Sequence, residues 1–128
     1  MGLLESLIEK SGHLYLKKLE FNELTPGRFF SKRVIDFGNG WKHFFVVLGP
    51  NVESPIHNHS GQNMAETHYL IYGSGKFIVY GDNKPKLEIV LQKGRLHEIF
   101  STPHFTPNHK YVAGPEGSIT MAFEKHYG

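Results

Sequence analysis

The sequence contains no cysteine, and this absence removes several kinds of chemistry at once. A chain of 128 residues without cysteine forms no disulfide bond and carries no thiol nucleophile. It also offers no thiolate ligands for zinc or for an iron–sulfur cluster. The common signatures of serine hydrolases (G-x-S-x-G), dinucleotide-binding folds (G-x-G-x-x-G) and zinc proteases (H-E-x-x-H) are missing as well.

Long apolar runs and an excess of charge of one sign are also lacking. No apolar run approaches the roughly 20 residues that a membrane-spanning helix needs, so we expect no membrane partner. The 14 basic and 12 acidic residues give a net charge of +2 without a basic stripe, which argues against nucleic acid as a partner. Glu5 and Glu9 stand where a signal peptide would carry positive charge. These features predict a cytoplasmic protein.

The residues that are present predict one globular domain over 1–128 that is mostly β-structure. Leu3, Leu4, Leu7 and Ile8 recur at helical spacing before Gly12, which indicates a short helix within 1–12. Turn-forming residues recur throughout the rest of the chain, at 25–27, 38–40, 73–75, 81–83 and 114–117. Between them we expect strands over 13–20, 28–36, 42–48, 66–72, 75–80, 86–92, 95–101, 109–113 and 118–125. Short strands without intervening helices favour an antiparallel sandwich or barrel.

Histidine and glutamate stand out in the segment from Ser54 to His68. The chain has 9 histidines, and two of them, His57 and His59, share one face of an extended segment because their spacing is two residues. Glu66 and His68 form a second pair of the same kind. The polar loop between the pairs can fold the chain back, so that two imidazoles and a carboxylate converge. Neutral imidazoles and carboxylates suit a divalent transition metal.

This segment resembles the first motif of the cupin superfamily, G-x5-H-x-H-x3,4-E-x6-G. Asn51 stands at the first glycine position and tolerates the same positive φ angle. The gap between His59 and Glu66 is six residues, which is longer than usual and similar to the H-x-H-x6-E of archaeal-type cupin phosphoglucose isomerases. The resemblance implies a double-stranded β-helix, or jelly-roll barrel, over about 28–125.

Cupins supply a further metal-binding histidine from a second motif, for which this chain has two candidates. His104 keeps the H-x3-N match with Asn108, but Pro107 interrupts a strand there. His109 opens a strand and is favoured. The resemblance therefore implies a divalent metal ion (Fe, Zn, Ni or Mn) held by His57, His59, Glu66 and His109, with coordination positions left for water or substrate.

Four further residues are candidates for contact with a substrate. His68 and Tyr72 follow Glu66 along the same strand and are expected to face the site, His68 as a proton carrier and Tyr72 as a hydrogen-bond donor. Core packing is an equal alternative for Tyr72. His104 and Lys110 are expected at the mouth of the barrel, where they would bind an anionic group of the substrate.

Three functions are compatible with this set of residues. The most concrete is a metal-dependent enzyme that isomerises a sugar or a keto/hydroxy compound, with the metal as Lewis acid. An Fe(II)-dependent dioxygenase and a non-catalytic barrel that binds a small sugar or acid are the alternatives. The resemblance also implies a homodimer, with residues 1–20 and the apolar face of the short helix as the natural contact.

Overall fold

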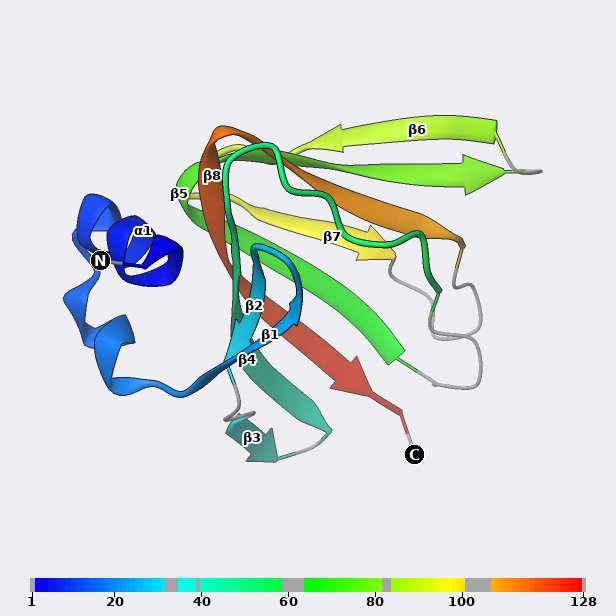
Figure 1. The fold of residues 1–128 in the computed structure, drawn as a ribbon. Helices are drawn as coiled ribbons and strands as arrows, with labels where there is room; N and C mark the ends of the chain where they lie inside the picture. Colours follow the sequence, from blue (N-terminus) through cyan, green and yellow to red (C-terminus); the bar gives the residue numbers. More distant parts are fainter. Residues whose placement is uncertain are drawn as a thin grey trace.

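Eight antiparallel strands and two short helices make up the described part of the chain (Figure 1). The computed structural model describes residues 2–31, 35–38, 40–58, 64–81, 84–100 and 107–127. The helices are α1 (Leu3–Ser11) and the 3-10 helix η1 (Leu14–Lys18). The strands are β1 (Phe21–Thr25), β2 (Arg28–Ser31), β3 (Ile35–Gly38), β4 (Trp41–Leu48), β5 (Met64–Gly81), β6 (Lys84–Val90), β7 (Leu96–Phe100) and β8 (His109–His126). This composition confirms the all-β fold with a short N-terminal helix.

The strands form one sheet in the order β1-β2-β4-β8-β5-β6, with β3 added to β4 and β7 added to β5. Every pairing is antiparallel. β8 lies at the centre, because its second half pairs with β4 on one side and its full length pairs with β5 on the other. The sheet therefore depends on contacts between residues far apart in the sequence.

β5 and β8 each continue through glycine-rich segments that the sequence predicted to be turns. The predicted hairpin at 73–75 and the predicted turn at 114–117 lie opposite each other. The register of the β5–β8 pairing shifts there, between the pairs Gly73↔Ser118 and Gly75↔Ala113. Both segments thus interrupt the pairing of two long strands without ending them. Glycine is needed here, because Gly73 has φ +77° and a Cβ atom on it would lie 2.0 Å from the carbonyl oxygen of Gly117.

The segment that precedes the predicted metal-binding histidines runs along the first half of β8. Backbone hydrogen bonds join Ser54 N to Tyr111 O (2.9 Å) and join His57 and His109 in both directions (2.9 and 2.8 Å). Asn51 begins this segment with φ +59°, which confirms the positive φ angle expected at this position. β8 therefore has a neighbour on each side along its whole length: β5 on one side, and on the other β4 beside its second half and this segment beside its first half.

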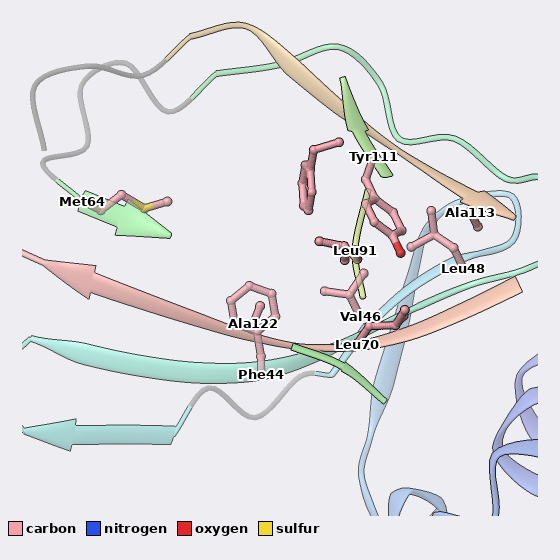
Figure 2. Close-up of a cluster of buried hydrophobic side chains, with 10 residues drawn as sticks. Phe44, Val46, Leu48, Met64, Leu70, Leu91, Tyr111, Ala113 and Ala122 are labelled. Atoms are coloured by element: carbon pink, nitrogen blue, oxygen red, sulfur yellow. The ribbon is translucent and has the colours of Figure 1, made fainter. Parts of the chain in front are cut away.

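The hydrophobic residues divide into two clusters, one on each face of the curved sheet. The inner cluster is drawn in Figure 2, with Met64 at the opposite end from Ala113. Its buried members are Phe44, Val46, Leu48, Met64, Leu70, Phe77, Leu91, Tyr111, Ala113 and Ala122. The outer cluster joins the two helices to the sheet through Leu7, Ile8, Leu16, Phe45, Val47, Ile71 and Ile119.

The N-terminal segment differs from the prediction in two respects. Residues 14–18 form η1 and not part of a strand over 13–20. The apolar face of α1 is covered by its own chain, since Leu7 and Ile8 are each 2% exposed against the outer cluster. The homodimer remains a prediction, but this face is not an open contact for it. Neither helix of the described residues is long and apolar enough to cross a membrane.

Candidate functional site

His57 and His109 lie side by side, with ring centroids 4.5 Å apart. The antiparallel bridge between their backbones brings them together from segments 52 residues apart in the chain. His57 Nδ1 donates a hydrogen bond to the carbonyl oxygen of Pro55 (2.8 Å), and His109 Nδ1 donates to that of Pro107 (2.9 Å). A carbonyl only accepts, so the proton sits on Nδ1 in both rings and Nε2 is the atom that presents a lone pair. Histidines that bind metals are held in this way.

Glu66 and His68 form a second, deeply buried pair on β5. They are 6% and 5% exposed, and His68 Nε2 lies 2.7 Å from Glu66 Oε1. The ring of Phe77 contacts the imidazole at 4.7 Å between centroids. His68 Nδ1 is buried without a hydrogen-bond partner among the described residues. A buried polar atom of this kind is costly unless something else satisfies it.

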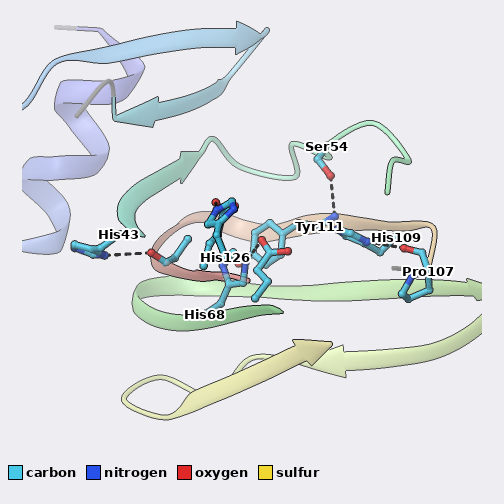
Figure 3. Close-up of polar contacts among 10 residues, drawn as sticks. His43, Ser54, His68, Pro107, His109, Tyr111 and His126 are labelled. Carbon is cyan, nitrogen blue, oxygen red and sulfur yellow. Dashed lines mark hydrogen bonds and ion pairs between the residues drawn. The ribbon is translucent and has the colours of Figure 1, made fainter. Parts of the chain in front are cut away.

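These two pairs line the same cavity, whose volume is about 180 Å³. Figure 3 shows His109 and Tyr111 on β8 and His68 on the neighbouring strand. The backbone N–H of Tyr111 donates a hydrogen bond to the Ser54 hydroxyl. Of the residues expected at the site, His57, Glu66, His68 and His109 therefore line one cavity. His59 and His104 lie outside the described residues.

The described residues fit a divalent metal by the chemistry of their donors, although they do not complete its site. Two imidazoles with oriented Nε2 atoms and one buried carboxylate face a common space. Within the described ranges no three His, Asp or Glu side chains stand close enough to hold an ion by themselves. His59, two residues after His57, is the predicted ligand that would have to complete the set.

Two predicted substrate contacts lie elsewhere. Tyr72 belongs to the outer cluster, because a shift of register between Leu70 and Tyr72 reverses which side chains of β5 face inward. The expectation that it shares the face of Glu66 is wrong. Lys110 alternates with its inward neighbours on β8 and forms an ion pair with Glu53, which raises the pKa of Lys110. It is not among the residues that line the cavity.

The cavity has five polar lining residues that the sequence did not single out. They are Arg28, Ser54, Tyr111, Thr120 and Glu124. The alternation of β8 could have indicated three of them, since Tyr111 shares the inward face with His109, and Thr120 shares it with Glu124. Burial raises the pKa of Tyr111 to about 12, so its hydroxyl stays protonated at neutral pH. No motif marked Arg28.

Not every histidine belongs to the cavity. His43 Nδ1 donates to the backbone oxygen of Ala122 (3.1 Å; Figure 3). The His43 ring stacks on Phe123, with 4.7 Å between the ring centroids. His126 lies 3.1 Å from Glu124 Oε1. Only the carboxylate of this last pair lines the cavity.

Comparison with known proteins finds similarity of structure without similarity of sequence. No protein-family model matches the chain, and no curated protein sequence matches it. An RmlC-like cupin from Shewanella frigidimarina superposes with a TM-score of 0.63 at 16% identity, over 87% of this chain and 86% of that one. Oxalate decarboxylase from Bacillus subtilis superposes with a TM-score of 0.66 at 17% identity, over 87% of this chain. The match spans only 28% of the decarboxylase chain, and it is a likeness of fold.

Proposed function

The chain has the cupin fold, and from the residues that line its cavity we propose that it is a metal-dependent enzyme acting on a small oxygenated metabolite. In its most specific form, the reaction is an isomerisation of a sugar or a keto/hydroxy compound. One observation carries the proposal: the oriented pair His57 and His109 shares a cavity with the buried pair Glu66 and His68. The first pair suits metal binding and the second suits proton transfer.

The metal would be held by His57, His109 and Glu66 together with His59. Fe, Zn, Ni and Mn are all compatible with imidazole and carboxylate ligands. When bound, a divalent ion supplies Lewis-acid polarisation of a carbonyl or hydroxyl oxygen. The carbonyls of Pro55 and Pro107 fix the two rings and increase the basicity of their Nε2 atoms.

We propose that His68 moves the proton. When its Nε2–H donates to Glu66, Nδ1 carries a lone pair that can take a proton from a carbon or hydroxyl of the substrate. The carboxylate 2.7 Å away then stabilises the imidazolium that forms. The contact with Phe77 holds the ring in this orientation. Isomerisation of a keto/hydroxy compound requires such a transfer between neighbouring atoms.

The walls of the cavity support this role. Phe44, Val46, Leu48 and Phe77 exclude water, which strengthens electrostatic interactions within the site. The hydroxyl of Thr120 can hydrogen-bond to a hydroxyl or carbonyl oxygen of a substrate. The cavity is thus built for a small ligand with several oxygen atoms.

Metal content, measured by mass spectrometry on tag-free protein, tests the proposal. We expect a nearly stoichiometric divalent metal in the wild type and its loss in the double variant His57→Ala/His59→Ala. His13→Ala is the matched control, since His13 packs on Tyr15 outside the cavity and its removal should leave the metal in place.

Two results would change the conclusion. A wild type that holds no metal and takes up none from a panel of divalent ions at neutral pH would contradict the proposal and favour a non-catalytic binding barrel. Iron in the site, with oxygen consumption in the presence of a substrate, would favour a dioxygenase over an isomerase.

His68→Gln tests the proton-transfer role separately. Glutamine keeps a polar side chain near Glu66 but cannot act as a base at neutral pH, so we expect kcat to fall by about 10²- to 10⁴-fold with the metal content unchanged. Incorporation of solvent deuterium into a keto/hydroxy substrate, followed by NMR, should fall equally. Unchanged deuterium incorporation in a metal-loaded variant would exclude His68 as the base.

A further inference from the structure

Arg28 lines the cavity and has no acidic partner among the described residues. It lies at the start of β2 and, with Phe30 two residues later, faces the inner side of the sheet. The guanidinium carbon stands 4.8 Å from the centroid of the Phe30 ring. Among the described residues, Arg28 makes no hydrogen bond or ion pair through its side chain. We infer that the ligand of this cavity carries a carboxylate and that Arg28 binds it.

The geometry of the guanidinium favours this role. The guanidinium lies over the Phe30 ring, and this contact restricts where the group can move. The N–H donors lie in the plane, at the edge of the group, where a carboxylate can accept two parallel hydrogen bonds. Preorganising the donor in this way lowers the entropy lost when the ligand binds.

A purely structural arginine would be expected to look different. Arginine can cover an aromatic ring while its head remains in water, but burial is sufficient here to lower the pKa of Arg28. Partial burial of a charge is unfavourable unless an opposite charge compensates for it. The described part of the chain supplies no such charge at Arg28, so the compensating anion is assigned to the ligand.

The charge of the lining selects a carboxylate over a phosphate. Among the lining residues that the structure describes, Arg28 alone carries a fixed positive charge, whereas Glu66 and Glu124 are acidic. The two charges of the proposed divalent metal are offset by Glu66 and Glu124, so a phosphate dianion would exceed the single charge left on Arg28, and no helix N-terminus borders the described cavity to help bind it. A monovalent carboxylate balances Arg28 with a single charge.

This inference deepens the proposed function and rests on the same cavity. The substrate class becomes a small hydroxy- or oxocarboxylate, whose carboxylate is held by Arg28 while the oxygen-bearing carbons lie toward His57, His109 and His68. Arg28 is then a substrate-binding residue, with the role that the sequence had predicted for Lys110, whereas the prediction for His104 concerns a residue outside the described ranges.

Binding of paired probes tests the inference. Affinities of acetate, pyruvate and lactate, and of acetamide, pyruvamide and lactamide, are measured by ligand-observed NMR on tag-free protein at neutral pH. We expect at least one carboxylate to bind more tightly than its amide. Arg28→Gln should weaken that carboxylate by roughly 10- to 100-fold and leave the amide unchanged. Arg28→Lys keeps the positive charge but not the two parallel N–H donors, so it should lose less affinity for the carboxylate than Arg28→Gln does.

Arg95→Gln is the matched control, because Arg95 is exposed and hydrogen-bonds to Gln92 outside the cavity. It should leave all affinities unchanged. A wild type that favours no carboxylate over its amide would overturn the inference, and so would unchanged affinity in Arg28→Gln with an unaltered melting temperature. Inorganic phosphate that binds more tightly than every carboxylate, and is lost in Arg28→Gln, would overturn the carboxylate assignment.

Metal content of the same samples separates this inference from the proposed function. Carboxylate binding that needs Arg28 in a protein without metal would contradict the metal-dependent enzyme and support the inference. If Arg28→Gln holds metal and binds the carboxylate with full affinity, the inference about Arg28 is contradicted and the metal-dependent enzyme is supported, since the carboxylate would then bind elsewhere in the site.

Discussion

Two proline carbonyls determine how the histidines of the site present themselves. Pro55 and Pro107 each stand two residues before a cavity histidine, and each accepts a hydrogen bond from its Nδ1. The two segments thus share the pattern P-x-H, from opposite sides of the bridge that joins His57 to His109. Proline restricts its own φ angle and so helps to fix the position of its carbonyl. The orientation of both rings is set by local sequence as much as by tertiary packing.

Tyr111→Phe gives a prediction for alkaline pH. The pKa of Tyr111 is about 12 in the fold against 10.0 ordinarily, so between these values the unfolded chain releases a proton that the folded chain keeps. Stability therefore falls with rising pH in this window and is unaffected below pH 10. At pH 12 the wild type should have lost roughly 2 to 3 kcal/mol of its free energy of unfolding through Tyr111, and Tyr111→Phe should not show this loss. Urea unfolding at several pH values measures it.

Tyr15→Phe is the control for that series, because Tyr15 is 51% exposed. It should keep the wild-type dependence on pH between 10 and 12. Parallel stability curves for Tyr111→Phe and the wild type would show that burial of the Tyr111 hydroxyl does not hold its proton.

At this scale the sequence was informative where spacing within one segment decides the geometry. His57, Glu66 and His68 follow from the alternation of an extended chain and from the motif. The prediction for Tyr72 failed because it assumed unbroken alternation past Leu70, where the register shifts. Arg28 was missed because its importance comes from what surrounds it in space, namely the Phe30 ring and the lack of an ion pair with any described residue. Such surroundings leave no signal at fixed spacing.

The facing glycine segments of β5 and β8 are the main feature at the scale of elements. They change the register of two paired strands at the same level, between Gly73↔Ser118 and Gly75↔Ala113. On one side of this break β8 pairs with β4, and on the other it pairs with the segment that carries His57. The break therefore separates the part of the sheet that carries Glu66 and His68, and binds the helices on its outer face, from the part that carries His57 and His109.

Gly73→Ala should weaken this arrangement. The added Cβ would meet the backbone oxygen of Gly117 at 2.0 Å while Gly73 holds φ +77°, so neither atom can move aside cheaply. We expect a loss of roughly 2 to 4 kcal/mol in the free energy of unfolding, measured by urea denaturation.

Gly81→Ala in the same strand is the matched control, since its Cβ would meet only the flexible side chain of Lys86. Its expected cost is below about 1 kcal/mol. Equal losses in the two variants would mean that the close approach at Gly73 does not govern stability.

Most strand positions could be predicted from turn chemistry, and the errors at the two glycine segments have a common cause. Thr25, Pro26 and Gly27 do join two paired strands, β1 and β2, as turn residues should. The glycines at 73–75 and 114–117 have the same composition but lie within strands. Glycine permits both a reversal of the chain and a bulge, and only long-range pairing decides between them.

At the scale of the whole molecule, the N-terminal helices act as a cover for the outer face of the sheet. Figure 1 shows α1 beside the bend shared by β5 and β8. Leu16 of η1 is 0% exposed in the outer cluster, next to side chains of the sheet such as Val47 and Ile119. The cavity lies on the other face, so this cover contributes to stability without touching the proposed site.

Leu16→Ala should therefore separate stability from ligand binding. We expect a loss of about 2 to 5 kcal/mol for this large-to-small change in a packed cluster, with metal content of the folded protein unchanged. Leu14→Ala, in the same helix but 55% exposed, should change stability by less than about 0.5 kcal/mol. Similar values for the two variants would show that η1 is not anchored through Leu16.

The central position of β8 has a consequence for how the protein is made. β8 follows every other described strand in the chain, yet it is the strand that joins β4 to β5. As the ribosome synthesises the polypeptide, β4 and β5 each emerge with an unpaired edge that only β8 can fill. His57 likewise emerges long before His109, its partner on β8. Pairing over such separations is slow, so we expect the nascent chain to acquire its sheet and its cavity in one late step, after residue 126 has left the ribosome.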